Sequence, residues 1–270
     1  MLETSLLEAK LNMNWNLLKN NLKPIQKICL TGLFIALAMV LQKVLAINYI
    51  PIVPFLRISL GGPAIIIFSS IFLGPLYGLI VGVASDVIGY FLLDPKMMGF
   101  LPQISAIYGV LGLLSCFIFL IFRYIKNEKM VIIFEGMTFL GILIGITLFL
   151  CFNTNLHLYS ATYHLEVWQK ILIPSLMFLL LAALFVTTII LNKKLKNDEL
   201  PMNPINISFS CFIIELLIMV MFGTIMKGWA FGFNTYPMIL ICQLIVLFIN
   251  VPLNTWLITL FLKLTKRFYN

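Results

Sequence analysis

Charged residues are scarce in this chain. They make up 10% of its 270 residues, against about 25% in an average soluble domain, while hydrophobic residues make up 61%. So few polar side chains cannot cover the surface of a globule in water. The composition therefore excludes a soluble cytoplasmic enzyme, a nucleic-acid-binding protein and a secreted disulfide scaffold, and it predicts a polytopic membrane protein.

Sequence motifs for catalysis or metal binding are also missing. The chain has no G-x-x-x-x-G-K-[ST] loop for ATP, no G-x-S-x-G elbow and no H-E-x-x-H pair. Its five cysteines lie in apolar segments without C-x-x-C spacing, and His157 and His164 have no third ligand near them in the sequence. We therefore expect no enzyme activity, no cofactor and no metal site.

Long uncharged runs dominate the sequence that is present. A membrane crossing needs about 20 mostly apolar residues. Within residues 58–85, Gly74-Pro75 is the only strong helix break, and it separates two spans of a tight hairpin. We expect an all-α bundle of about eight transmembrane spans, at residues 28–47, 58–73, 75–93, 103–122, 131–152, 171–192, 206–226 and 237–262.

The positive charges predict how these spans are oriented. If both termini are cytoplasmic, 13 of the 18 Lys and Arg residues fall on the cytoplasmic side. This is a clear positive-inside bias, which a seven-span arrangement would reverse in the later loops. Residues 1–27 are predicted to form a cytoplasmic amphipathic segment that lies on the membrane surface and ends near Pro24, followed by an integral membrane domain of residues 28–270.

Small residues mark one face of the third span. Gly78, Gly82 and Asp86 recur every four residues, so a neighbouring backbone can approach this face closely. Asp86 lies deep in the span, where an acidic group costs roughly 2.5–3.5 kcal/mol. It is therefore either a functional group or a hydrogen-bonded clamp between helices. Glu215 is a second deep acid, whereas Glu135 is expected near a membrane face, where it could reach water.

Residues 57–92 (RISLGGPAIIIFSSIFLGPLYGLIVGVASDVIGYFL) carry the most specific pattern. An Arg-Ile-Ser start is followed by a Gly-Pro-x-x-Gly hairpin and then by Gly82, Asp86 and Gly89. Residues 99–112 (GFLPQISAIYGVLG) add a Gly-Phe-x-Pro loop. These segments resemble the second to fourth helices of S components, the substrate-binding subunits of energy-coupling factor (ECF) vitamin transporters, and especially their folate group. The resemblance covers about residues 28–122 and, less closely, residues 206–262.

The resemblance implies a fold, a role and partners. S components of this type usually have six helices, so residues 128–200 are interpreted as an insertion of two further helices. An S component captures a vitamin at the outer face of the bacterial cytoplasmic membrane. It then associates with a transmembrane T component and two ATPase subunits, which tilt it and release the substrate inside. Gly32 and Ala36, four residues apart, are similar to the small-residue motif that these proteins present to the T component.

Arg57 is the sharpest candidate for substrate binding. It is the only arginine on the predicted external side, and its planar fork of donors suits a carboxylate. Folate joins a flat ring to glutamate carboxylates, so it needs an aromatic slot as well as an anion clamp. The slot candidates are Phe100, Phe233 and Tyr236, while Gln103 and Gln243 could address ring edges. The full set of candidate binding residues is Arg57, Ser59, Asp86, Tyr90, Phe100, Gln103, Phe233, Tyr236 and Gln243.

Other interpretations stay open from the sequence alone. Arg57 could instead reach lipid headgroups, and the vitamin could be pantothenate or a thiamin-like compound. The chain could also be an autonomous ion-coupled secondary transporter that uses Asp86 and Glu215 as proton carriers, although we find no inverted repeat. A membrane scaffold without transport activity is the third alternative.

Overall fold

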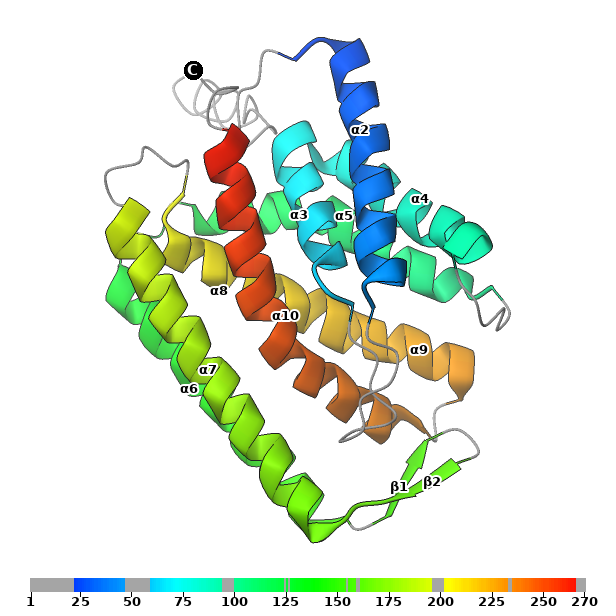
Figure 1. Ribbon diagram of the computed structural model, residues 1–270, viewed down its shortest axis with the longest axis vertical. Coiled ribbons are helices and arrows are strands. Elements are labelled where there is room, and N and C mark those ends of the chain that lie inside the picture. Colours follow the sequence, from blue (N-terminus) through cyan, green and yellow to red (C-terminus); the bar gives the residue numbers. More distant parts are fainter. Residues whose placement is uncertain are drawn as a thin grey trace, which may run out of the picture.

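The computed structural model is a bundle of helices with one short β-hairpin (Figure 1). It describes residues 22–46, 59–93, 100–123, 125, 127–153, 155–158, 161–195, 202–232 and 235–265. Two helices are continued by π-helical segments, named η1 and η2. The helical elements are α2 (Pro24–Met39) with η1 (Val40–Val44), α3 (Gly62–Leu73), α4 (Pro75–Leu93), α5 (Pro102–Phe122), α6 (Glu128–Phe152), α7 (Val167–Leu195), α8 (Pro204–Ile214) with η2 (Glu215–Phe222) and α9 (Gly223–Phe231), and α10 (Tyr236–Leu264). Strands β1 (Asn155–Leu158) and β2 (Ala161–His164) pair antiparallel between α6 and α7.

Seven helical stretches in the described part of the chain are long and apolar enough to cross a membrane. They coincide with seven of the eight expected spans, so the predicted all-α polytopic bundle is confirmed. The expected span 58–73 is different, because α3 has only 12 residues. At 1.5 Å per residue α3 is about 18 Å long, which is short of the roughly 30 Å hydrocarbon core.

Proline and glycine set several helix boundaries. Proline is favoured in the first helical turn, because its missing N–H would have no partner there. Between α3 and α4 the chain turns at Gly74, whose φ of 109° favours glycine, and Pro75 then starts α4. A proline stands at the first or second position of α2, α3, α5, α8 and α10.

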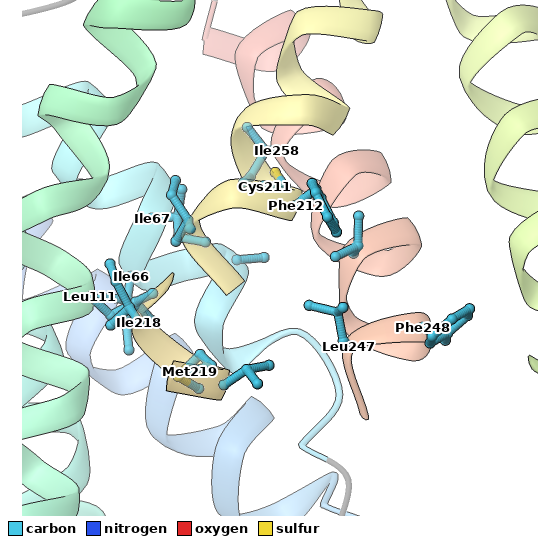
Figure 2. Packing of buried hydrophobic residues seen from close by; sticks show 14 of the residues in the cluster. Ile66, Ile67, Leu111, Cys211, Phe212, Ile218, Met219, Leu247, Phe248 and Ile258 are labelled. Atoms are coloured by element: carbon cyan, nitrogen blue, oxygen red, sulfur yellow. The ribbon is translucent and has the colours of Figure 1, made fainter. Parts of the chain in front are cut away.

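The short helix α3 is the centre of the bundle. All 12 of its residues are buried, and it packs against α2, α4, α5 and α10. In Figure 2, Ile66 of α3 lies beside Leu111 of α5 and Ile218 of η2. The core around this helix is mostly apolar, as its largely apolar sequence requires, and its buried Ser70 accepts a 3.1 Å hydrogen bond from the backbone N–H of Cys116 on α5.

Contacts with α10 show which part of that helix lies beside α3. The rings of Phe68 and Phe261 are 5.2 Å apart, and a Cβ on Gly61 would lie 2.6 Å from a methyl carbon of Leu257. Leu257 stands 21 residues beyond Tyr236, or about 31 Å along α10. The helix α3 therefore lies beside the C-terminal half of α10, and its N-terminus is inside the bundle.

Helices α6 and α7 form a hairpin that packs on α8 and α10 (Figure 1). The ring of Phe139 on α6 lies 5.0 Å from that of Phe248 on α10. At the open end of the hairpin, Glu128 accepts hydrogen bonds from Asn192 and Asn203. The two helices of the hairpin are thus held together with the start of α8 at this end. The interpretation of residues 128–200 as an insertion stays a prediction.

The N-terminal prediction falls almost entirely on residues that the structure does not describe. Residues 1–21 lie outside the described ranges, and α2 begins at Pro24, where the amphipathic segment was expected to end. The cytoplasmic location of both termini stays a prediction.

Candidate functional site

Three polar side chains join three helical elements inside the bundle. Lys43 Nζ lies 3.2 Å from Asp86 Oδ1, and Ser105 Oγ donates a 2.7 Å hydrogen bond to Asp86 Oδ2. Lys43 belongs to η1, Asp86 to α4 and Ser105 to α5. Asp86 is only 4% exposed, so these bonds take the place of water around its carboxylate. Asp86 therefore holds η1, α4 and α5 together through one ion pair and one hydrogen bond.

Close contact between α4 and α5 positions this carboxylate. A Cβ on Gly82 would collide with the carbonyl oxygen of Tyr108, and a Cβ on Gly112 would collide with that of Gly78. The close backbone approach predicted for the glycine face is confirmed. It brings the next residue of the stripe, Asp86, within reach of Ser105.

The π-helical end of the first span carries two polar residues into the protein. Gln42 is 2% exposed, and the side chain of Lys43 is 10% exposed. Short π-helical turns are rare and occur frequently at functional sites. The turn η1 is therefore a functional candidate on grounds of backbone geometry as well as polarity.

Sequence reasoning missed the internal partner of Lys43. The charge count puts Lys43 on the external side, which stays a prediction, and the structure pairs its ammonium group with Asp86. One signal could have identified the pair, because Lys43 falls inside the expected span 28–47 and Asp86 inside the span 75–93. Opposite charges in two membrane spans are expected to pair.

Two of the expected aromatic residues come together at the end of α4. The rings of Tyr90 and Phe100 are 5.4 Å apart, although they come from α4 and from the residue two positions before α5. Phe91 stacks on Phe100 with a centroid distance of 5.7 Å and an interplanar angle of 26°. Tyr90 and Phe100 thus lie in contact and form one aromatic wall, and its use as a slot for a flat ring stays a prediction.

The remaining candidate residues are dispersed over the bundle. Gln103, in the first turn of α5, has a buried Oε1 without a hydrogen-bond partner among the described residues. Tyr236 and Gln243 are seven residues apart, so they share one face of α10, and both are partly buried. Ser59 is partly buried just before α3.

Two expected residues cannot be placed. Arg57 and Phe233 lie outside the described residues, so their roles stay predictions. Within the described ranges, the hydrogen bonds to Asp86 come from Lys43 and Ser105, and Tyr236 and Gln243 take no part in them.

Two further acids are buried deeper in the bundle. Asn254 donates a 2.6 Å hydrogen bond to Glu215, the first residue of η2. Ser208 donates a 2.8 Å hydrogen bond to Glu135, which is 2% exposed. The expectation that Glu135 reaches water is wrong, because α8 covers this face of α6 and supplies the serine. Both acids bond neighbouring helices together.

Metal-binding clusters are absent from the part of the chain that the structure describes. No group of three His, Cys, Asp or Glu side chains there could hold a metal ion. The buried polar groups among these residues are instead suited to hydrogen bonding and to the ion pair of Lys43 and Asp86.

Comparison with known proteins gives one match. A family model described as the substrate-specific component of ECF transporters matches residues 26–192. These residues run from the start of α2 to the end of α7, which is more than half of the chain. No curated protein and no solved structure matches the chain.

Proposed function

Because this chain belongs to the substrate-specific components of ECF transporters, we propose that it captures a folate-type vitamin for import. Members of the family bind small-molecule substrates, work with T and ATPase modules and are binding subunits rather than enzymes. The family match over residues 26–192 is the observation that carries the role of substrate-binding subunit. Location in the bacterial cytoplasmic membrane is part of the proposal.

The proposed binding site lies at one end of the bundle. Here η1 and α4 end and α5 begins, because Asp86 bonds both Lys43 and Ser105. With both termini in the cytoplasm, this end faces outward. It carries the aromatic wall of Tyr90 and Phe100 and the partly buried side chain of Gln103. An aromatic wall beside an amide group suits a flat heteroaromatic ring. Tyr236 and Gln243 are on the N-terminal half of α10, and their part in binding stays a prediction.

Arg57 is proposed to bind the carboxylates of the vitamin. It precedes Ser59 by two residues and the buried helix α3 by five in the sequence. Lys43 already lies against Asp86, so its charge is neutralised within the protein. A guanidinium can bind a carboxylate with two parallel hydrogen bonds, which lysine cannot reproduce.

The surface of α2 supports a proposed interface with the T component. Gly32 and Ala36 are both exposed, and a Cβ on Gly32 would meet no atom within 4 Å. A partner helix can therefore approach the α2 backbone closely along this face. In lipid such close packing stabilises association between helices, because burial of apolar surface contributes little there.

Ligand binding by the purified protein tests the proposed substrate. Isothermal calorimetry with folate is expected to show binding that Arg57→Ala weakens about tenfold or more and that Arg57→Lys restores only in part. Pterin, which is the ring without carboxylates, should bind both variants as it binds the unmodified protein. Arg123→Lys is the matched control, since Arg123 follows α5 at the opposite end of the bundle.

Equal folate affinities for the unmodified protein and Arg57→Ala would contradict the proposal that Arg57 binds the carboxylates of the vitamin. The substrate proposal would then shift to a neutral or cationic vitamin. A screen of folate, pantothenate and thiamin by thermal shift, followed by calorimetry, identifies which class is bound.

A further inference from the structure

The N-terminus of α3 is buried inside the protein without a cap. Gly62, Pro63 and Ala64 are all buried, and no described side chain caps the helix. The residue before it is Gly61, which has no side chain to offer, and the first backbone bond runs from Ile65 N to Gly61 O. The free N–H groups of a first helical turn need a partner from a side chain, water or a ligand when the turn is buried.

Gln42 lies against this helix end with its amide unsatisfied. Only 2% of the residue is exposed, and neither Nε2 nor Oε1 has a hydrogen-bond partner within the described residues. A Cβ on Gly62 would collide with Cγ of Gln42, so the side chain packs directly on the start of α3. A buried amide with both groups unpaired destabilises the protein, and such groups are rare without a function.

The surrounding charges select the kind of group that can bind here. Lys43 follows Gln42 in η1, but Asp86 at 3.2 Å neutralises its charge. A helix N-terminus alone contributes roughly half a positive charge. An anion buried at this depth would therefore lack a full counter-charge, whereas a neutral polar group avoids that cost.

The hydrogen-bonding pattern defines the neutral group further. The N–H groups of α3 and Nε2 of Gln42 donate, whereas Oε1 of Gln42 accepts. A ligand satisfies both kinds with a carbonyl oxygen beside an N–H, which is the edge of a lactam ring. Pterins and flavins carry this edge.

We propose that Gln42 and the N-terminus of α3 form the deep end of the substrate site and bind the lactam edge of a heteroaromatic ring. This inference rests on the proposed function, and it assigns the ring of the vitamin to the interior of the bundle. Leu253 and Leu257 of α10 lie near Gly61, so apolar side chains flank this polar point. Gln42 is thus a specificity-determining residue for the ring.

Calorimetry on the purified full-length protein tests the inference with three probes. These are pterin, folate, and p-aminobenzoylglutamate, which keeps the carboxylates and lacks the ring. Gln42→Met retains the length of the side chain and removes its hydrogen bonds. It should weaken pterin and folate binding about tenfold or more and leave p-aminobenzoylglutamate binding unchanged.

Thermal unfolding without ligand distinguishes recognition from a structural role. Gln42→Met removes two polar groups that have no hydrogen-bond partner among the described residues, so its unfolding temperature should equal or exceed that of the unmodified protein. Gln169→Met is the control, since this buried glutamine lies in the first turn of α7. It should leave the binding of all three probes unchanged.

The binding results distinguish failure of this inference from failure of the proposed function. Folate binding that Gln42→Met leaves within twofold overturns the inference and preserves the folate proposal. If folate fails to bind but riboflavin binds in a Gln42-dependent manner, the folate proposal fails and the inference stands. A protein that binds neither pterin, folate nor riboflavin contradicts the inference, and binding of pantothenate would then still support vitamin capture.

Discussion

At the residue scale, the pair of Lys43 and Asp86 carries the main electrostatic consequence of the fold. Both side chains are removed from water and bonded to each other across two helices. The net value of such a pair is small, because each ion loses its hydration. Removing one partner is costly, however, since the other charge then stays buried alone.

Asp86→Asn is therefore expected to lower the free energy of unfolding by about 3–5 kcal/mol. The double variant Lys43→Met with Asp86→Leu should recover much of this loss, because no charge is left unpaired. Thermal unfolding in detergent, followed by tryptophan fluorescence, measures both effects. Glu166→Gln changes an exposed carboxylate and should have no effect. An unfolding temperature unaltered by Asp86→Asn would show that the ion pair is not formed.

Gly82→Ala tests the contact between α4 and α5. The added Cβ would collide with the carbonyl oxygen of Tyr108, so a loss of about 1–3 kcal/mol is expected from overpacking. Gly141→Ala is the matched control, because a Cβ there meets nothing within 4 Å. Equal unfolding temperatures for the two variants would contradict the close approach of the backbones.

Sequence reasoning predicted Asp86 and its glycine face but not its partner. A four-residue period defines which residues share a helix face, so the approach of α4 to a neighbour follows from the sequence. It does not define which residue of another helix stands opposite. That depends on the level at which η1 ends beside α4, which packing determines.

At the element scale, α3 is shorter than the expected span 58–73, again because the sequence does not define which parts of different helices lie side by side. Prolines and the Gly74-Pro75 turn mark helix starts in the sequence, and most of the expected spans agree with the helices found. Residues 58–73 read as one uncharged run, but the helix begins only at Gly62, after Gly61 with a φ of 81°. Local sequence could not show that this start would lie beside Leu257 of α10.

The exposed face of α2 gives a prediction about partner binding. Gly32→Leu and Ala36→Leu should leave folding and ligand affinity unchanged and abolish uptake, because the added side chains obstruct helix approach. Gly145→Leu on α6 is the control, since a Cβ at Gly145 also meets nothing within 4 Å. Uptake that persists in both α2 variants would place the interface on another surface.

The hairpin of α6 and α7 is predicted to be dispensable for ligand binding. Replacing residues 128–200 with a short Gly/Ser linker should retain ligand binding, because Glu128 and Asn203 are already hydrogen-bonded to each other. The uncovered faces of α8 and α10 are mostly apolar and would meet lipid. Calorimetry in detergent measures the affinity. Loss of binding by a variant that elutes as a single folded species would make the hairpin part of the site.

At the scale of the whole molecule, the family match assigns the chain to binding subunits that work with separate energising modules. The chain belongs to the substrate-specific components of ECF transporters, which work with T and ATPase modules. Its deep acids bond neighbouring helices: Asp86 to Lys43 and Ser105, Glu215 to Asn254, and Glu135 to Ser208. This arrangement favours a structural role for these acids over the proton-carrying role that a secondary transporter would require.

Uptake of radiolabelled folate by proteoliposomes tests the central claim most directly. The vesicles contain this chain alone, or this chain with the T component and both ATPases, with ATP enclosed or omitted on the ATPase side. The account predicts uptake only when the complete module and ATP are present. It also predicts no uptake by the chain alone when a proton gradient is imposed. Uptake by the chain alone, driven by the gradient and independent of ATP, would contradict the account.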